Sequence, residues 1–139
     1  MNQAQKAEFV TGLGTRLADA PLLMLADYRG VTVAEIEAFR RTLEAKGVQY
    51  EVIKNTLARR AVAGTDMEGV SQWLTGMTGW VISGDDPIAT AKVVRDAIKD
   101  LNKADKFTIK GGFFEGEALD EIVDALTSED QARKLAEVT

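Results

Sequence analysis

Four short apolar segments, separated by stretches with helical spacing, constrain this 139-residue chain more than any other feature of its sequence. Each segment is rich in apolar or β-branched residues, which is typical of buried strands. We predict strands at residues 22–26, 48–53, 78–83 and 107–114. Two strand–helix–strand units joined by a short helical insertion indicate one sheet covered by helices. At this length, a single domain is the expected organisation for residues 1–139.

Capping signals support the helices that periodicity predicts. Thr32 and Glu35 form a capping box, in which a hydroxyl at the N-cap is answered by a carboxylate three residues later. Asp86 followed by Pro87 combines an acidic N-cap with proline at the first helical position, and that helix is expected to reach about residue 103. Further helices are predicted at residues 3–18, 55–63 and 66–74, around Leu119–Leu126, and from a capping box at Ser128–Gln131.

The composition argues against an enzyme. The chain has no histidine and no cysteine, so the commonest neutral-pH base, the commonest zinc ligand and thiolate chemistry are all absent. The adjacent carboxylates Asp85 and Asp86 are a weak catalytic candidate, because Asp86 is already explained as a helix cap. We therefore expect no catalytic residue, no metal and no cofactor. No signal core and no membrane-length apolar run occur, so we expect a cytoplasmic protein without a membrane partner.

Charge is unevenly distributed along the chain. The formal net charge is −5, yet residues 1–60 carry +2 and residues 61–139 carry −7. Net charge bears on partners and solubility rather than on fold. The first part of the chain is therefore the one expected to meet a polyanion, whereas the second part is expected to present a solvated face.

The strongest candidate site is a basic segment that begins where the second predicted strand ends. Lys54 closes that strand, Asn55 and Thr56 are residues that open helices, and Arg59 and Arg60 lie on the helix face opposite the apolar residues. Cations neutralise phosphates, while amides, hydroxyls and backbone N–H groups fix the register of a nucleic acid. The alternative is a capped surface helix whose arginines pair with neighbouring carboxylates.

Two further motifs leave alternatives open. Arg29 follows the first predicted strand and could reach a phosphate, and Tyr28 could stack on an unpaired base. The same residues could equally form an ordinary turn at the end of a strand. Lys110-Gly111-Gly112 superficially resembles a phosphate-binding loop, but its spacing matches no such motif and a bulged strand is the better interpretation.

Several of these motifs occur together, in order, in one known family. The chain resembles the bacterial large-subunit ribosomal protein ten family, the stalk-base proteins, over roughly residues 3–137. The resemblance is carried by Asp27-Tyr28-Arg29-Gly30-Val31-Thr32, Arg40-Arg41-x-Leu43-x-Ala45-x-Gly47, Lys54-Asn55-Thr56-Leu57-Ala58-Arg59-Arg60-Ala61, Ser83-x-Asp85-Asp86-Pro87, Ala91-Lys92 and Ile109-Lys110-Gly111-Gly112-x-x-x-Gly116.

The resemblance implies an α+β fold, namely a ferredoxin-like α/β sandwich with a helical insertion between strands two and three and flanking terminal helices. It implies a structural protein that binds large-subunit ribosomal RNA (rRNA) at the base of the ribosomal stalk, beside ribosomal protein eleven. The rRNA-binding residues are expected to be Arg29, Lys54, Asn55, Thr56, Arg59 and Arg60.

In the family, a long C-terminal helix carries dimers of the acidic stalk protein, which recruit translational GTPases. The sequence stops at Thr139, where that helix would begin, so the expectation is that this chain lacks it. The competing function is a protein-interaction module without RNA, in which the acidic second half and residues 117–137 would dock a partner protein.

Overall fold

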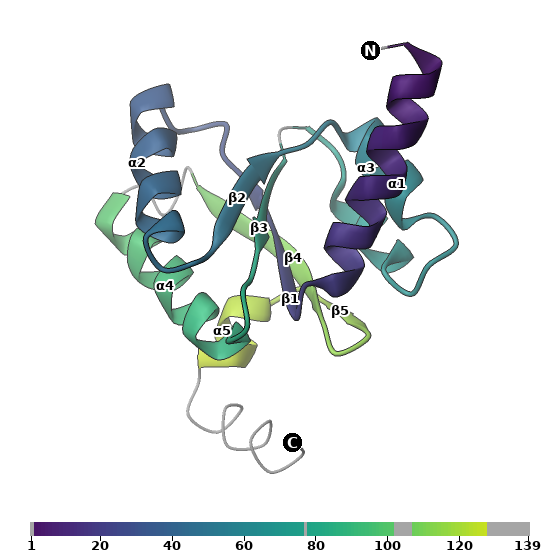
Figure 1. Cartoon of the computed structure of the whole chain (residues 1–139). Coiled ribbons are helices and arrows are strands. Elements are labelled where there is room, and N and C mark those ends of the chain that lie inside the picture. The colour runs from purple at the N-terminus through teal and green to yellow at the C-terminus, as the bar shows by residue number, and fades with distance from the viewer. Residues whose placement is uncertain (1, 77, 102–106, 128–139) are drawn as a thin grey trace.

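In the computed structural model, which describes residues 2–76, 78–101 and 107–127, the strands form one antiparallel sheet (Figure 1). The strands are β1 (Leu22–Asp27), β2 (Gln49–Val52), β3 (Gly79–Ile82), β4 (Thr108–Phe114) and β5 (Glu117–Leu119), in the spatial order β2-β3-β1-β4-β5. The helices are α1 (Gln3–Asp19), α2 (Val33–Glu44), α3 (Asn55–Val62), the 3₁₀ helix η1 (Glu68–Trp73), α4 (Pro87–Leu101) and α5 (Ile122–Thr127).

The chain order β1-α2-β2, then β3-α4-β4, together with the sheet order β2-β3-β1-β4, is the ferredoxin-like arrangement. The α+β prediction is therefore confirmed. The helical insertion between the second and third strands is also present, as α3 and η1.

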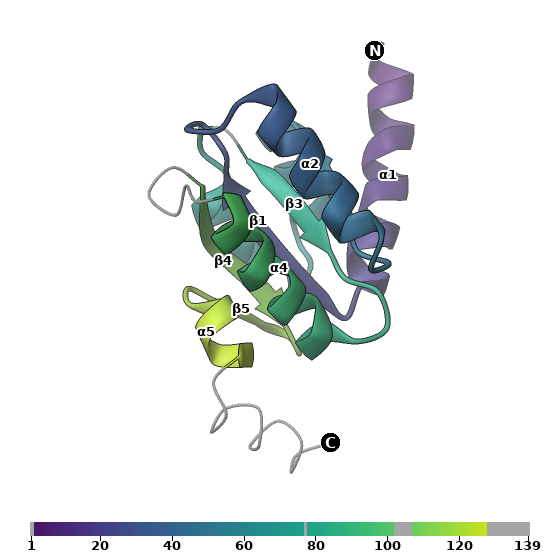
Figure 2. The same cartoon turned by 90° about the vertical axis from the view of Figure 1, so that its left-hand side faces the viewer.

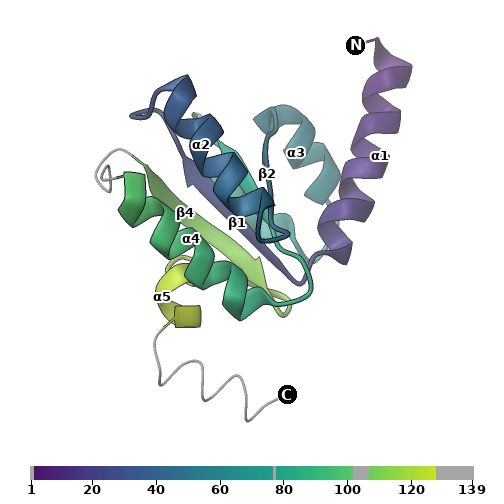
Figure 3. The same ribbon diagram turned by 60° about the vertical axis from the view of Figure 1, so that its left-hand side comes forward.

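Both faces of the sheet are covered. In β1, Leu22, Met24 and Ala26 pack into the core beneath α2 and α4, whereas Leu23 and Leu25 pack into a second core with α1, α3 and η1. Successive residues of a strand point to opposite faces, and both faces of this sheet are covered, so all five side chains are buried. Figures 2 and 3 show α2 and α4 side by side over one face, with α1 behind the sheet. The insertion thus closes the face that α2 and α4 leave uncovered.

The predicted caps are formed. The backbone N–H of Glu35 donates to Thr32 Oγ1 at 3.2 Å, and the N–H of Thr32 donates to Glu35 Oε1 at 2.9 Å. The N–H of Ala89 donates to Asp86 Oδ1 at 3.0 Å, as an N-cap followed by proline predicts. These local hydrogen bonds satisfy helix N–H groups that have no partner within the helix.

The prediction of a helix beginning at Leu119 is wrong in its first turn. Leu119 belongs to β5, which pairs with β4 through a tight hairpin in which Phe114 faces Glu117. Glu115 and Gly116 form its two-residue turn, with φ angles of 50° and 82°, the left-handed conformations such hairpins require. The helix starts only at Ile122, and the predicted capping box at residues 128–131 lies outside the described residues.

The bulge predicted in the fourth strand is present. Along β1, Leu25 pairs with Gly111 but Ala26 pairs with Ile109, so Lys110 is the extra residue. A Cβ at Gly111 would overlap the indole ring of Trp73 from η1. The glycine therefore allows the insertion to pack directly on the strand, and the bulge sets the direction of Lys110.

Candidate nucleic-acid interface

The candidate residues gather at one end of the sheet because of its antiparallel register. Ala26 and Val52 both face Gly79, and Asp27 faces Thr108. The ends of β1 and β2 therefore lie next to the beginnings of β3 and β4 at one end of the sheet. Helices α2 and α3 begin near this end, at the top of Figure 1. Residues from four separate stretches of sequence come together there, and we call this part of the molecule the basic end.

Helix α3 presents its polar side outward, as its periodicity predicts. Its apolar side packs into the second core, whereas Thr56, Arg59 and Arg60 are exposed. Lys54 is the N-cap residue, is exposed, and makes no side-chain capping bond. In the described part of the chain, Lys54, Thr56 and Arg60 make no side-chain hydrogen bond or ion pair, so these groups are available to a ligand.

Two of the predicted contact residues already hold another part of the protein. Asn55 Nδ2 donates to the carbonyl oxygen of Gly76 at 2.8 Å, and the guanidinium of Arg59 donates to the carbonyl oxygen of Leu74. Both acceptors belong to the segment between η1 and β3. Arg59 is exposed as predicted, but it also anchors this segment, and Asn55 acts chiefly as a support for it.

Arg29 leaves the end of β1 and pairs with Asp27. Its Nη2 lies 2.8 Å from Asp27 Oδ2, and its Nε donates to Asp27 Oδ1 at 3.1 Å. The Arg29 side chain remains 64% exposed, so one face of the guanidinium is open to solvent. Burial alone would raise the pKa of Asp27, but the hydrogen bonds from Arg29 and the positive charges of Arg29 and Lys110 hold that pKa below its usual value.

Lys110, which sequence reasoning did not select as a site residue, completes the basic end. Its Nζ donates to the carbonyl oxygens of Trp73 and Thr75, at 3.1 and 2.7 Å, and to Thr78 Oγ1 at 2.9 Å. Burial lowers the pKa of Lys110, the positive charge of Arg29 acts in the same direction, and Asp27 opposes the shift. The sequence feature that could have identified Lys110 is its position directly before Gly111 and Gly112 in a strand with a predicted bulge.

These contacts border a shallow groove of about 410 Å³, which we call the basic-end groove. It is lined by Tyr28, Val52, Ile53, Lys54, Asn55, Thr56, Gly76 and Thr78.

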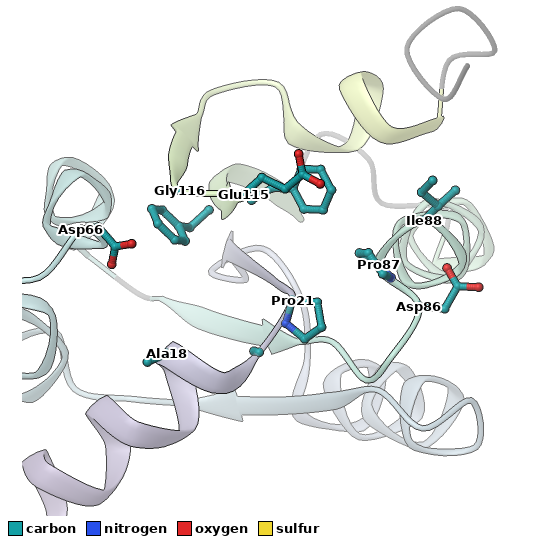
Figure 4. A pocket seen from close by; sticks show the side chains of 11 residues that line it. Ala18, Pro21, Asp66, Asp86, Pro87, Ile88, Glu115 and Gly116 are labelled. Carbon is teal, nitrogen blue, oxygen red and sulfur yellow. The ribbon is translucent and has the colours of Figure 1, made fainter. Parts of the chain in front are cut away.

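A larger concavity of about 600 Å³ lies at the opposite end of the sheet, near the start of β1 and the β4–β5 turn. Figure 4 shows Asp66, Asp86 and Glu115 around it, on three separate elements. Because these carboxylates repel phosphate, the basic end is the better place for a nucleic acid.

The described residues provide neither a cluster of metal ligands nor a membrane-spanning helix. They contain no group of three or more potential metal-ligating side chains. None of their helices is long and apolar enough to cross a bilayer.

A sequence profile described as Ribosomal protein L10 matches residues 1–99 of this chain. The chain belongs to the ribosomal protein L10 family. This membership confirms the family that the sequence motifs indicated, and it agrees with the prediction that the chain is not an enzyme.

Individual relatives give the same assignment. Proteins named large ribosomal subunit protein uL10 from Pelobacter propionicus and Leptothrix cholodnii are 42% and 44% identical to this chain over 120 residues. These matches cover 86% of this L10-family chain and 68% and 64% of the two relatives. The relative from Methylibium petroleiphilum is 43% identical over 129 residues, covering 92% of this chain and 72% of its own length. The chain thus spans about two thirds of the length of these relatives.

Proposed function

We propose that this chain is a structural protein of the large ribosomal subunit that binds rRNA at the base of the stalk through its basic end. The observation that carries the proposal is a cluster of exposed polar and cationic side chains. Lys54, Thr56 and Arg60 make no side-chain bond within the described residues, and Arg29 and Arg59 are exposed although each makes a hydrogen bond. The cations would contact phosphates, and Thr56 would fix register. Asn55 would act by holding the loop wall at Gly76.

The names of the relatives support this function over a protein-interaction module without RNA. Ribosome association would also place the protein in the cytoplasm. Contacts with ribosomal protein eleven and with acidic stalk dimers are finer proposals, and they rest on the family resemblance.

The test is a fluorescence-anisotropy titration of a stalk-base rRNA fragment at two salt concentrations. The variant Lys54→Ala/Arg60→Ala removes two exposed cations from the basic end, and Lys92→Ala/Lys99→Ala removes two exposed cations from α4 on the other side of the sheet. Each phosphate contact contributes ~0.7–0.9 to the slope of log affinity against log salt. The first variant should bind more weakly and flatten the slope by roughly 1.4–1.8.

The α4 variant should resemble the wild type. Equal losses in both variants would show that affinity follows net charge alone. Unchanged affinity in Lys54→Ala/Arg60→Ala would remove the basic end as the interface.

A further inference from the structure

We propose that the basic-end groove binds one unpaired nucleotide of the RNA, with its base against Tyr28 and Val52 and its phosphate beside Lys54. This inference rests on the proposed RNA-binding function and names what one part of that interface would recognise. It concerns a subsite distinct from the phosphate contacts of Arg60 on the outer face of α3.

The first argument is the apolar wall of the groove. Val52 ends β2, lines the groove and is 46% exposed, so its apolar side chain is open to a ligand. Tyr28 is half-buried and packs against the first core, so its ring is held in place. The backbone of a duplex offers only phosphate and sugar, whereas an unstacked base offers an apolar face. The wall therefore fits a base that has left its helix.

The second argument is charge and size. Lys54 is a cation, and among the described residues no carboxylate lines the groove. The lining thus favours an anion, in contrast to the acid-lined concavity at the other end of the sheet. A volume of about 410 Å³ falls within the range of pockets that hold small organic ligands, about 300–1,000 Å³. A single nucleotide has this chemistry, namely one anionic group and one flat apolar group.

The third argument concerns Gly76 and Thr78, two further lining residues that hydrogen bonds already hold. The Gly76 carbonyl oxygen accepts a hydrogen bond from Asn55 at 2.8 Å, and Thr78 Oγ1 accepts one from Lys110 at 2.9 Å. These two residues are held from α3 and from β4, so they do not have to be ordered when the ligand binds. Preformed sites lose less conformational entropy on binding, so the groove is suited to recognition.

The experiment compares three variants in the anisotropy titration. Tyr28→Ala and Val52→Ser remove the two parts of the apolar wall, and Tyr28→Phe keeps the ring as the matched control. Loss of one base–aromatic stack weakens binding by roughly 5- to 150-fold. We expect that loss for Tyr28→Ala, a smaller loss for Val52→Ser, wild-type affinity for Tyr28→Phe, and an unchanged salt slope, since stacking releases no counterions. Because Val52 is exposed, Val52→Ser should fold even if Tyr28→Ala does not.

The probes are the stalk-base rRNA fragment, a fully paired RNA duplex of equal length, and AMP alone. The inference requires the rRNA fragment to bind more tightly than the duplex, and AMP to bind far more weakly than the fragment. Wild-type affinity in Val52→Ser and Tyr28→Ala, equal binding of the duplex, or tight binding of AMP would overturn it. Failure of the wild-type chain to bind the rRNA fragment at all would instead overturn the proposed function.

Discussion

The ammonium nitrogen of Lys110 lies 2.7 Å from the carbonyl oxygen of Thr75, although the two residues are 35 positions apart in the chain. Two more acceptors, on Trp73 and Thr78, surround the same nitrogen. One side chain from β4 therefore holds the segment before β3 through residues on both sides of Gly76, and Gly76 and Thr78 line the basic-end groove.

Replacing Lys110 by methionine should loosen this segment and lower the free energy of unfolding by about 1–2 kcal/mol, because two carbonyl groups lose a charged donor. Urea unfolding measures the loss, and hydrogen exchange at Thr75 and Gly76 should show faster exchange. The matched control is Lys99→Met on the exposed side of α4. Equal stability and equal exchange in both variants would contradict a clamp at Lys110.

The Asp27–Arg29 pair predicts a specific loss of stability in acid. The pKa of Asp27 is lower in the folded protein than its usual value of 3.8, so the folded state binds this proton less readily than the unfolded chain does. The contribution of Asp27 is therefore present above that usual value and disappears as pH falls through the lowered pKa.

The stability difference between the wild type and Asp27→Asn should shrink as pH is lowered below about 4. Denaturant melts across pH 2–7 measure it, with Asp85→Asn as the control because Asp85 is exposed and forms no ion pair in the described residues. A difference that stays constant down to pH 2 would refute the assignment.

Tyr50 offers a route to higher stability. Its ring is buried, with an edge contact to Phe39 at 5.3 Å between centroids. Its hydroxyl has no hydrogen-bond partner in the described structure. Burial raises the pKa of Tyr50, so the hydroxyl remains un-ionised at neutral pH.

Tyr50→Phe keeps the ring contact and removes a buried polar atom that makes no bond, so we expect the free energy of unfolding to rise by about 1 kcal/mol. Thermal unfolding followed by circular dichroism measures this, beside Tyr28→Phe at a half-buried tyrosine. A lower melting temperature for Tyr50→Phe would mean that the hydroxyl has a partner.

The close packing of Trp73 on Gly111 predicts that a larger residue at position 111 would destabilise the protein. Because a Cβ at Gly111 would overlap the indole ring, Gly111→Ala should cost about 1–3 kcal/mol of stability through overpacking. Trp73→Leu makes room at the same contact, so the double variant should lose clearly less than the sum of the two single losses. Strictly additive losses in a denaturant-unfolding cycle would show that the ring is not what requires the glycine.

Local signals predicted most of the elements. The Thr32–Glu35 capping box and the Asp86–Pro87 pair marked two helix starts correctly, because capping depends on residues three positions apart. The missed strand β5 shows the limit of this approach. Its three residues have little periodicity of their own, and it is a strand because the Glu115-Gly116 turn brings it against β4.

The arrangement of the candidate site residues, too, was predicted correctly only where local sequence patterns decide the outcome. The periodicity of residues 55–62 predicted correctly that Arg59 and Arg60 are exposed, since a helix of 3.6 residues per turn separates them from Leu57 and Val62. It did not predict that Arg59 and Asn55 also hold the segment before β3, because both acceptors lie at least 15 positions further along the chain.

The sequence by itself therefore determined the starts of α2 and α4, the buried side of α3 and the family, all of which depend on neighbouring residues or on ordered motifs. Only the tertiary structure decided which cations are free and which are structural. Antiparallel pairing brings Asp27, Val52 and Lys110 to the same end of the sheet. Their proximity depends on strand register, a property that no single segment of the sequence contains.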